Sequence, residues 1–100
     1  MGITLKQRDE STVICLGGDI DISSAAELKK AFVDALKPGR AVLVSLDSNT
    51  DLDVTAIQLL WAAEQKAKAS GVKLGLDGQV PEKVSAALKD AGFEEFPFPA

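Results

Sequence analysis

Four segments of the chain carry apolar residues in the patterns of β-strands. Residues 3–9, ITLKQRD, alternate between apolar and polar positions, which predicts an edge strand with one exposed face. Residues 12–18, TVICLGG, and 40–47, RAVLVSLD, have nearly continuous apolar centres and indicate central strands. We expect the first of these two to be covered on both faces. Residues 72–77, VKLGLD, alternate again and predict a half-covered strand.

In three other segments the apolar residues recur every three or four positions, as in helices that cover a sheet. The first helix is expected to begin after an N-cap at Ser23 or Ser24, with Glu27 as the capping-box partner of Ser24. The second spans about residues 54–70 and the third about residues 81–91. A glycine follows each of these last two, as is typical of helix ends.

The order of these elements predicts the fold class. Two strands are followed by helices and strands in alternation, which favours right-handed crossovers and parallel pairing. We therefore expect a single α/β domain over residues 1–100, with a mixed, mostly parallel sheet of four to five strands. The first strand is expected to lie antiparallel at an edge, and three to four helices to cover the sheet.

The stretch DLDVTAIQLLWAA, residues 51–63, leads into a helix with apolar residues on more than one side. At 100° per residue, one arc is expected to face the core, and it carries Ala56, Leu59, Leu60, Ala63 and Ala67. The opposite arc is expected to be solvated, and it carries Gln58, Glu64, Gln65 and Lys68. Within the solvated arc lie three further apolar residues, Val54, Ile57 and Trp61.

Two interpretations of this outward stripe are open. A loop or the aromatic carboxyl-terminal residues 93–100, FEEFPFPA, can cover it, and we expect Phe93 and Phe96 to pack on the core. Alternatively the stripe is a contact surface for another protein, because exposed apolar stripes mark such surfaces and tryptophan is enriched at their energetic centres. The stripe begins at a helix amino terminus, where free N–H groups favour anions.

Composition and charge narrow the classes of function. The chain contains no histidine and no tyrosine, so the usual nucleophile–base pairs of enzymes cannot form, and we expect a protein without catalytic activity. The net charge is −4 and the lysines and arginines are scattered, which argues against nucleic-acid binding. No glycine-rich phosphate loop is present, and we expect no cofactor.

A single cysteine excludes an internal disulfide and a cysteine-based metal site, and we expect Cys15 to be a small buried apolar residue. The amino-terminal residues do not have the pattern of a signal peptide, and no apolar run approaches the roughly 20 residues of a membrane helix. A cytoplasmic protein that does not insert into a membrane is therefore expected.

Four aspartates follow the predicted strands, and they are Asp21, Asp47, Asp51 and Asp53. Carboxylates that converge at the carboxyl ends of strands are able to hold a hard cation. The spacing of a calcium loop is absent, however, and capping and turn formation account for the aspartates more simply. We expect no metal site.

The whole chain resembles a STAS domain, the fold of bacterial anti-sigma-factor antagonists. The likeness lies in LGGDIDISSAAELKKAF (residues 16–32), in AVLVSLDSNTDLDVTAIQLL (residues 41–60), and in AKASGVKLGL and LKDAGF. The order and spacing of these segments carry the resemblance. It implies a regulatory protein that binds an ATP-binding partner, which in that family is both the anti-sigma factor and a serine kinase.

The resemblance also implies where such a partner binds. In the family, a serine or threonine directly after a loop aspartate accepts the phosphate, and the unphosphorylated form binds the partner. Asp53 matches that aspartate, Asp21 matches an acidic residue near the site, and Val54 falls on the acceptor position. Because valine has no hydroxyl group, Thr55 becomes the candidate acceptor. Thr55 is otherwise an ordinary first-turn residue behind an Asp53 cap.

Several functions are consistent with this pattern. The first is a module that docks on an anti-sigma factor or serine kinase through the start of the second helix, with Asp21, Asp53, Val54, Thr55, Ile57, Gln58 and Trp61 at the interface. A STAS adaptor in a chemosensory, two-component or lipid-transport complex, without phosphorylation, is an alternative. A small enzyme or ligand carrier, with a pocket at the carboxyl edge of the sheet, is a further one.

Overall fold

A computed structural model describes residues 2–37 and 39–93 of the chain. The β-strands in this part are β1 (Gly2–Gln7), β2 (Ser11–Gly17), β3 (Asp19–Ile20), β4 (Ala41–Leu46), β5 (Asp51–Leu52) and β6 (Leu74–Leu76). The helices are a 3₁₀ turn η1 (Ile22–Ser24), α1 (Ala25–Ala35), α2 (Val54–Ser70) and α3 (Glu82–Asp90). Their order matches the order of strands and helices expected from the sequence, apart from the short β3 and β5.

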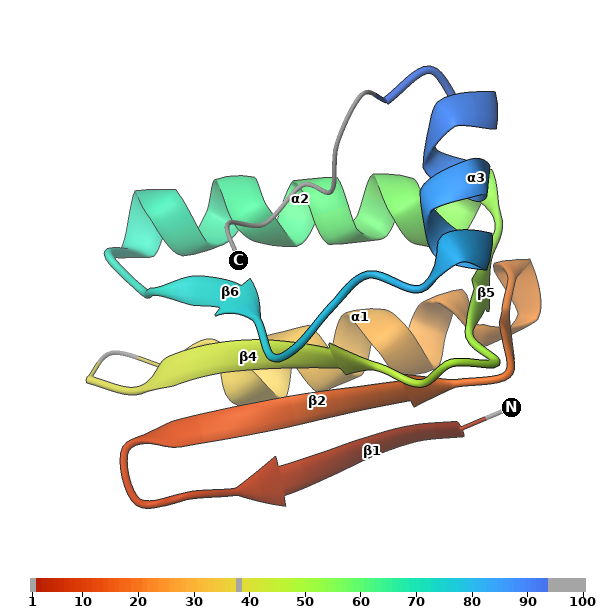
Figure 1. The fold of residues 1–100 in the computed structure, drawn as a ribbon. Coiled ribbons are helices and arrows are strands. Elements are labelled where there is room, and N and C mark those ends of the chain that lie inside the picture. Colours follow the sequence, from red (N-terminus) through yellow and green to blue (C-terminus); the bar gives the residue numbers. More distant parts are fainter. Residues whose placement is uncertain (1, 38, 94–100) are drawn as a thin grey trace.

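The main sheet has four strands in the order β1-β2-β4-β6 (Figure 1). β1 pairs antiparallel with β2 at one edge, while β2, β4 and β6 run parallel. Parallel neighbours require crossovers, and α1 and α2 supply the crossovers to β4 and β6. The predicted α/β class, the mostly parallel sheet and the antiparallel edge strand are confirmed.

Helices α1 and α2 lie on the same face of the sheet and pack against each other (Figure 1). The core between them and the sheet consists of aliphatic side chains and one phenylalanine, and its largest members include Ile14, Leu16, Leu28, Phe32, Val44 and Leu60. Phe93 is half-buried against this core, as expected. Phe96 lies outside the described residues, so its expected packing is not described.

In the part of the chain that the structure describes, α1 and α2 leave the opposite face of the sheet uncovered, which corrects two expectations in part. Directly paired residues of neighbouring strands share a face, and the pairs Thr4–Cys15 and Cys15–Ser45 lie on the face away from the helices. On this face β2 is therefore covered only in part, because Val13 is buried there whereas Cys15 is partly exposed rather than buried. Because both crossovers have the same hand and follow strands added in one direction, both helices pack on the same face.

The helix ends show one confirmed cap and one wrong one. Asp53 accepts a hydrogen bond from the Ala56 backbone N–H at 2.9 Å, and Gly71 ends α2 in a left-handed conformation with φ of 71°. Ser24 precedes α1 with a helical backbone and makes no side-chain cap bond, so its predicted capping box with Glu27 is wrong. The cause is the preceding 3₁₀ turn, because a capping serine needs an extended backbone.

Arg40 holds the β1–β2 hairpin against the start of β4. Its Nη2 donates to the carbonyl oxygens of Arg8 and Ser11, each at 2.7 Å, and to Gln7 Oε1 at 3.1 Å. These bonds fix the edge strand at its turn. Among the residues that the structure describes, no helix combines the length and the apolar character that crossing a membrane requires.

Candidate functional site

A second, two-stranded sheet brings the two predicted site segments together. β3 pairs parallel with β5, with Asp19 opposite Asp51 and Ile20 opposite Leu52. The Asp53 backbone N–H continues the ladder by donating to the Ile20 carbonyl oxygen at 3.1 Å. As a result Asp21, which follows β3, lies beside Asp53, which follows β5, and η1 contacts α2.

The loop between β4 and β5 is anchored by buried hydrogen bonds. Thr50 is fully buried, and its hydroxyl donates to the Leu16 carbonyl oxygen at 2.8 Å. The Asp47 backbone N–H donates to the same oxygen at 3.0 Å, and the Asp51 N–H donates to the Gly18 carbonyl oxygen at 2.8 Å. The end of β2 therefore holds this loop in place and sets the direction in which α2 starts.

The outer side of α2 exposes two of the three residues of the predicted stripe. The side chain of Val54 is 52% exposed and that of Trp61 is 49% exposed. Gln58, one turn after Val54, is also exposed. Val54 and Trp61 are seven residues apart, so they lie on the same side of the helix, about 10 Å apart along its axis.

Ile57 does not belong to this stripe, and its predicted outward position is wrong. Its side chain is fully buried in the main core. Glu64, which was expected in the solvated arc, is also buried, and Leu59 of the predicted core arc is only half-buried. The reason is that α2 contacts α1 as well as α3, β5 and η1, so its buried arc is wider than one sheet face requires and is rotated toward Ile57.

Ile22 is a residue of this region that the sequence analysis did not identify. Its side chain is 73% exposed, the highest value among the exposed large apolar side chains of the described residues. In the stretch DIDI, Ile22 alternates in step with the buried Ile20, which suggests an inward position. The 3₁₀ turn that begins at Ile22 breaks the alternation, and the only sequence signal for it was the Asp21-x-Ser23 turn pattern.

Because η1 contacts α2, we group the exposed residues of this region under one name, the α2-start surface. It consists of the acidic residues Asp21 and Asp53, the exposed apolar residues Ile22, Val54 and Trp61, and the polar Gln58. Thr55 borders it as the second residue of α2 and is half-buried. Of the predicted site residues, the fold thus gathers all except Ile57 at or beside this surface.

A small cleft lies between the ends of β3 and β5. It has a volume of about 200 Å³ and is lined by Asp19, Asp21, Asp51 and Asp53 together with Ile20 and Leu52. The Asp53 carboxylate is engaged in capping α2, and that of Asp21 accepts bonds from Ser23. The described residues contain no group of three or more acidic or cysteine side chains arranged to hold a metal ion. The cleft therefore makes this end of the molecule acidic.

Asp21 is held in its charged form by local hydrogen bonds. The Ser23 hydroxyl donates to Asp21 Oδ1 at 2.5 Å, and the Ser23 backbone N–H donates to the same oxygen at 3.0 Å. The hydroxyl bond is the main reason why the pKa of Asp21 lies below its ordinary value of 3.8. Because the pKa of Asp21 is lower in the folded than in the unfolded chain, its charged carboxylate stabilises the folded state at pH values above the unfolded-state pKa. This stabilisation is lost as the pH falls through the folded-state pKa.

Replacing Ser23 by alanine is therefore expected to raise the pKa of Asp21 toward 3.8. The shift is measured by following the Asp21 side-chain carboxyl carbon by NMR as the pH is lowered. Ser48→Ala is the control, because Ser48 bonds to Asp47 only through its backbone N–H, and this variant should leave the pKa of Asp21 unchanged. An unchanged Asp21 pKa in Ser23→Ala would show that the hydroxyl bond is not the cause.

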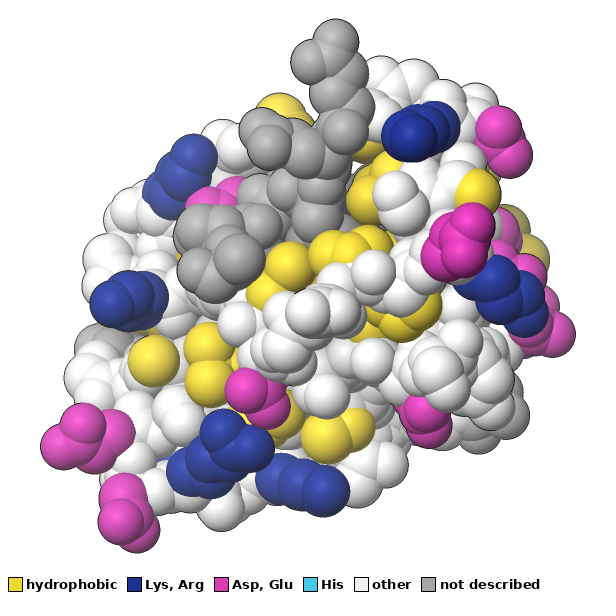
Figure 2. Space-filling model, in the orientation of Figure 1, with side chains coloured by type: hydrophobic (Ala, Val, Ile, Leu, Met, Phe, Trp, Pro, Cys, Tyr) yellow, Lys and Arg dark blue, Asp and Glu magenta, His cyan; other side chains and the backbone are white. Residues whose placement is uncertain are grey.

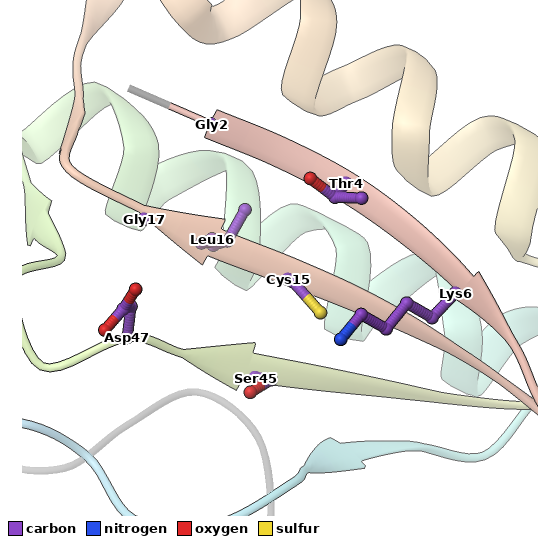
Figure 3. A pocket seen from close by; sticks show the side chains of 8 residues that line it. All are labelled: Gly2, Thr4, Lys6, Cys15, Leu16, Gly17, Ser45 and Asp47. Carbon is purple, nitrogen blue, oxygen red and sulfur yellow. The ribbon is translucent and has the colours of Figure 1, made fainter.

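A separate, open cleft lies on the face of the main sheet away from α1 and α2 (Figure 3). Its volume is about 460 Å³, and its polar lining comes from Thr4 and Lys6 of β1, Cys15 of β2, and Ser45 and Asp47 at the end of β4. Figure 2 shows apolar side chains gathered in the middle of this side of the molecule and charged side chains around its margin. The cleft is not closed by a covering element of the described residues, unlike the enclosed pockets typical of ligand carriers.

Comparison with known proteins identifies the family to which these features correspond. A family model described as "Mlab, STAS domain" matches residues 3–97, nearly the whole chain. No curated protein is significantly similar to the chain in sequence.

Solved structures show the same fold. SpoIIAA, an anti-sigma factor antagonist, matches in its unphosphorylated form with a TM-score of 0.65 and 15% identity, over 80% of this chain and 76% of that chain. The phosphorylated form of the Bacillus cell fate determinant SpoIIAA matches with a TM-score of 0.63 and 14% identity, over 99% of this chain and 91% of that chain. An antisigma-factor antagonist STAS domain from Rhodobacter sphaeroides matches with a TM-score of 0.64 and 18% identity, over 83% of this chain and 94% of that chain.

A further structure, described as Mglu, has a TM-score of 0.65 and 19% identity over 81% of this chain. The match covers only 20% of the Mglu chain. At these identities the structural matches establish the shared fold.

Proposed function

Since the chain belongs to the STAS domain family, we propose that it is a regulatory binding module that docks on an ATP-binding signalling protein through the α2-start surface. The observation that carries this proposal is the grouping of Ile22, Val54 and Trp61. Five large apolar side chains of the described residues are exposed, and three of them lie on this surface. Exposed apolar groups rimmed by polar ones are typical of protein interfaces.

The charge of the surface indicates what the partner presents. Asp21 and Asp53 flank the apolar residues, and Asp19 and Asp51 line the adjacent cleft. A partner with lysine or arginine side chains around an apolar centre would be complementary to this arrangement, and it would be steered toward the surface in solution. The absence of histidine from the chain supports a binding role rather than a catalytic one.

The anti-sigma factor kinase is the partner that the likeness to SpoIIAA supports best. That protein is an anti-sigma factor antagonist with solved unphosphorylated and phosphorylated forms. In the present chain Thr55 is the candidate acceptor, at the second position of α2 beside Asp53. A phosphate there would add about −1.5 to −2 charge units next to an apolar interface, and the cost of desolvating them would weaken docking.

Val54, which occupies the acceptor position of the family, favours a second form of the same function. A valine side chain has no hydroxyl group, so an adaptor that docks without phosphorylation, in a chemosensory, two-component or lipid-transport complex, also fits this chain. Both forms use the same surface. They differ in whether the docked partner transfers a phosphate.

The docking proposal is tested by capture on the immobilised chain from a lysate of the organism that encodes it. We expect the wild-type chain to retain a protein that binds an ATP analogue, and Ile22→Asp and Val54→Asp to lose it, because each places a charge in the apolar centre. Val33→Asp is the matched control, since Val33 is equally exposed but lies on α1, away from this surface. Equal retention by all four chains, or a retained protein without ATP binding, would contradict the proposal.

Phosphorylation is tested by incubating the chain with the captured partner and ATP, followed by mass spectrometry of its peptides. If the kinase form is right, phosphate is found on Thr55 and is absent from Thr55→Ala. Val54→Ser restores a hydroxyl group at the family acceptor position. An unmodified wild-type chain together with a phosphorylated Val54→Ser chain would eliminate Thr55 as acceptor and leave the adaptor form.

A further inference from the structure

A second surface lies between α1 and α2, apart from the α2-start surface. It is a groove of about 370 Å³ with a mainly apolar lining. One wall is formed by Lys29, Phe32 and Val33 of α1 and by Leu36, which directly follows it, and the other by Leu59, Ala62, Ala63 and Lys66 of α2. Val33 is 60% exposed at its rim. Trp61 does not line the groove and points to another side of α2.

The lining residues repeat with the period of a helix on both walls. On each helix they occupy positions i, i+3, i+4 and i+7, counted from Lys29 on α1 and from Leu59 on α2. The groove therefore follows both helices for two turns, about 10 Å. Because each helix leads from one parallel strand toward the next, α1 and α2 run in the same direction (Figure 1). Lys29 is the first lining residue of one wall and Lys66 the last of the other, so the two lysines stand at opposite ends of the groove.

The charged side chains that line the groove are both cationic. The chain as a whole has more acidic than basic residues, 15 against 11. Neither Lys29 nor Lys66 forms an ion pair with any of the described residues.

From the apolar lining, the helical period and the paired lysines, we propose that this groove binds an acidic amphipathic helix of a partner protein. The side chains of a helix fill the spaces between the ridges of two neighbouring helices, and such grooves select anchors at i, i+3, i+4 and i+7. Aspartate or glutamate residues on both sides of the apolar stripe of the partner pair with Lys29 and Lys66. The domain then joins two proteins, one on each side of α2.

A helix fits the groove better than other ligands. An extended strand would gain no backbone hydrogen bonds there, because the walls are helices without free sheet edges. A small ligand would keep part of its surface in water, since pockets for such ligands bury about 70–90% of the ligand surface and this groove is only partly enclosed.

The proposal is tested with two synthetic amphipathic peptides of about 18 residues, long enough to form a helix. Both carry leucine at i, i+3, i+4 and i+7, and the stripe is flanked by glutamate in one peptide and by lysine in the other. We expect the acidic peptide to bind the wild-type chain about tenfold more tightly than the basic one, from two favourable charge pairs. In NMR titrations its amide shifts should concentrate on the eight residues that line the groove, four on each wall.

Charge reversal provides the matched variant. The double variant Lys29→Glu/Lys66→Glu, altered only at exposed positions, is expected to prefer the basic peptide, while Trp61→Ala keeps the wild-type preference. The proposal is overturned if both peptides bind equally, if neither binds, or if the shifts fall on the α2-start surface. It is also overturned if sedimentation shows a dimer that Val33→Asp dissociates, because the occupant of the groove is then a second copy of the chain. If laurate gives the same shifts as the acidic peptide, the occupant is a small amphiphile, and the proposal is again overturned.

Discussion

Ile57→Ala is expected to lower the free energy of unfolding by about 3 kcal/mol, the typical cost of truncating a fully buried isoleucine. Its side chain lies in the core cluster with residues of both helices and the sheet. Removing three carbon atoms there loses apolar burial and leaves a cavity that the surrounding elements fill only in part. Urea denaturation followed by circular dichroism measures the change.

Val54→Ala is the control for this experiment. Val54 is also β-branched and lies three residues earlier on the same helix, but it is half-exposed. Its replacement is expected to change the free energy of unfolding by about 0.5 kcal/mol or less. Similar losses in the two variants would mean that Ile57 and Val54 share one face, as the angular pattern of the sequence suggested, and that the wider buried arc of α2 is wrong.

Trp61→Ala is expected to weaken binding of the ATP-binding partner by about 2 kcal/mol, which corresponds to a loss of affinity of about thirtyfold. Trp61 is half-exposed, so it has a large apolar area left to bury in a complex while its remaining contacts hold it in one orientation. Tryptophan in such a position is the side chain that most often dominates an interface. Isothermal titration calorimetry with the captured partner measures the affinity.

The interpretation of this loss requires that the domain remains folded. The far-ultraviolet circular dichroism spectrum of Trp61→Ala should match that of the wild-type chain, because the core residues beneath it are unchanged. Val33→Ala, which removes an exposed apolar side chain from the groove between α1 and α2, should bind this partner with wild-type affinity. If Trp61→Ala binds as tightly as the wild-type chain, Trp61 lies outside the interface.

The groove and the α2-start surface lie on different sides of α2, so the two proposals are independent. A chain that loses the ATP-binding partner through Ile22→Asp still has both lysines of the groove. A chain with Lys29→Glu and Lys66→Glu still has Trp61 and Val54. Variants of one surface therefore serve as controls for the other.

The sequence by itself determined the features that depend on short-range interactions. The bounds of α2 follow from Asp53, whose side chain accepts a hydrogen bond from the Ala56 backbone N–H, and from Gly71, which adopts a left-handed conformation that other residues disfavour. The edge position of β1 follows from its alternating pattern. The family follows from the order and spacing of several such local signals along the chain.

Only the tertiary structure decided which side chains of these elements are buried. Ile57 is buried because α2 has neighbours on several sides, and Ile22 is exposed because β3 ends in a 3₁₀ turn beside β5. Asp21 lies next to Asp53 because two short strands pair across 32 residues of sequence (51 − 19). Periodicity describes one element and one covering face, whereas burial depends on every element that packs against it, and these contacts join residues far apart in the chain.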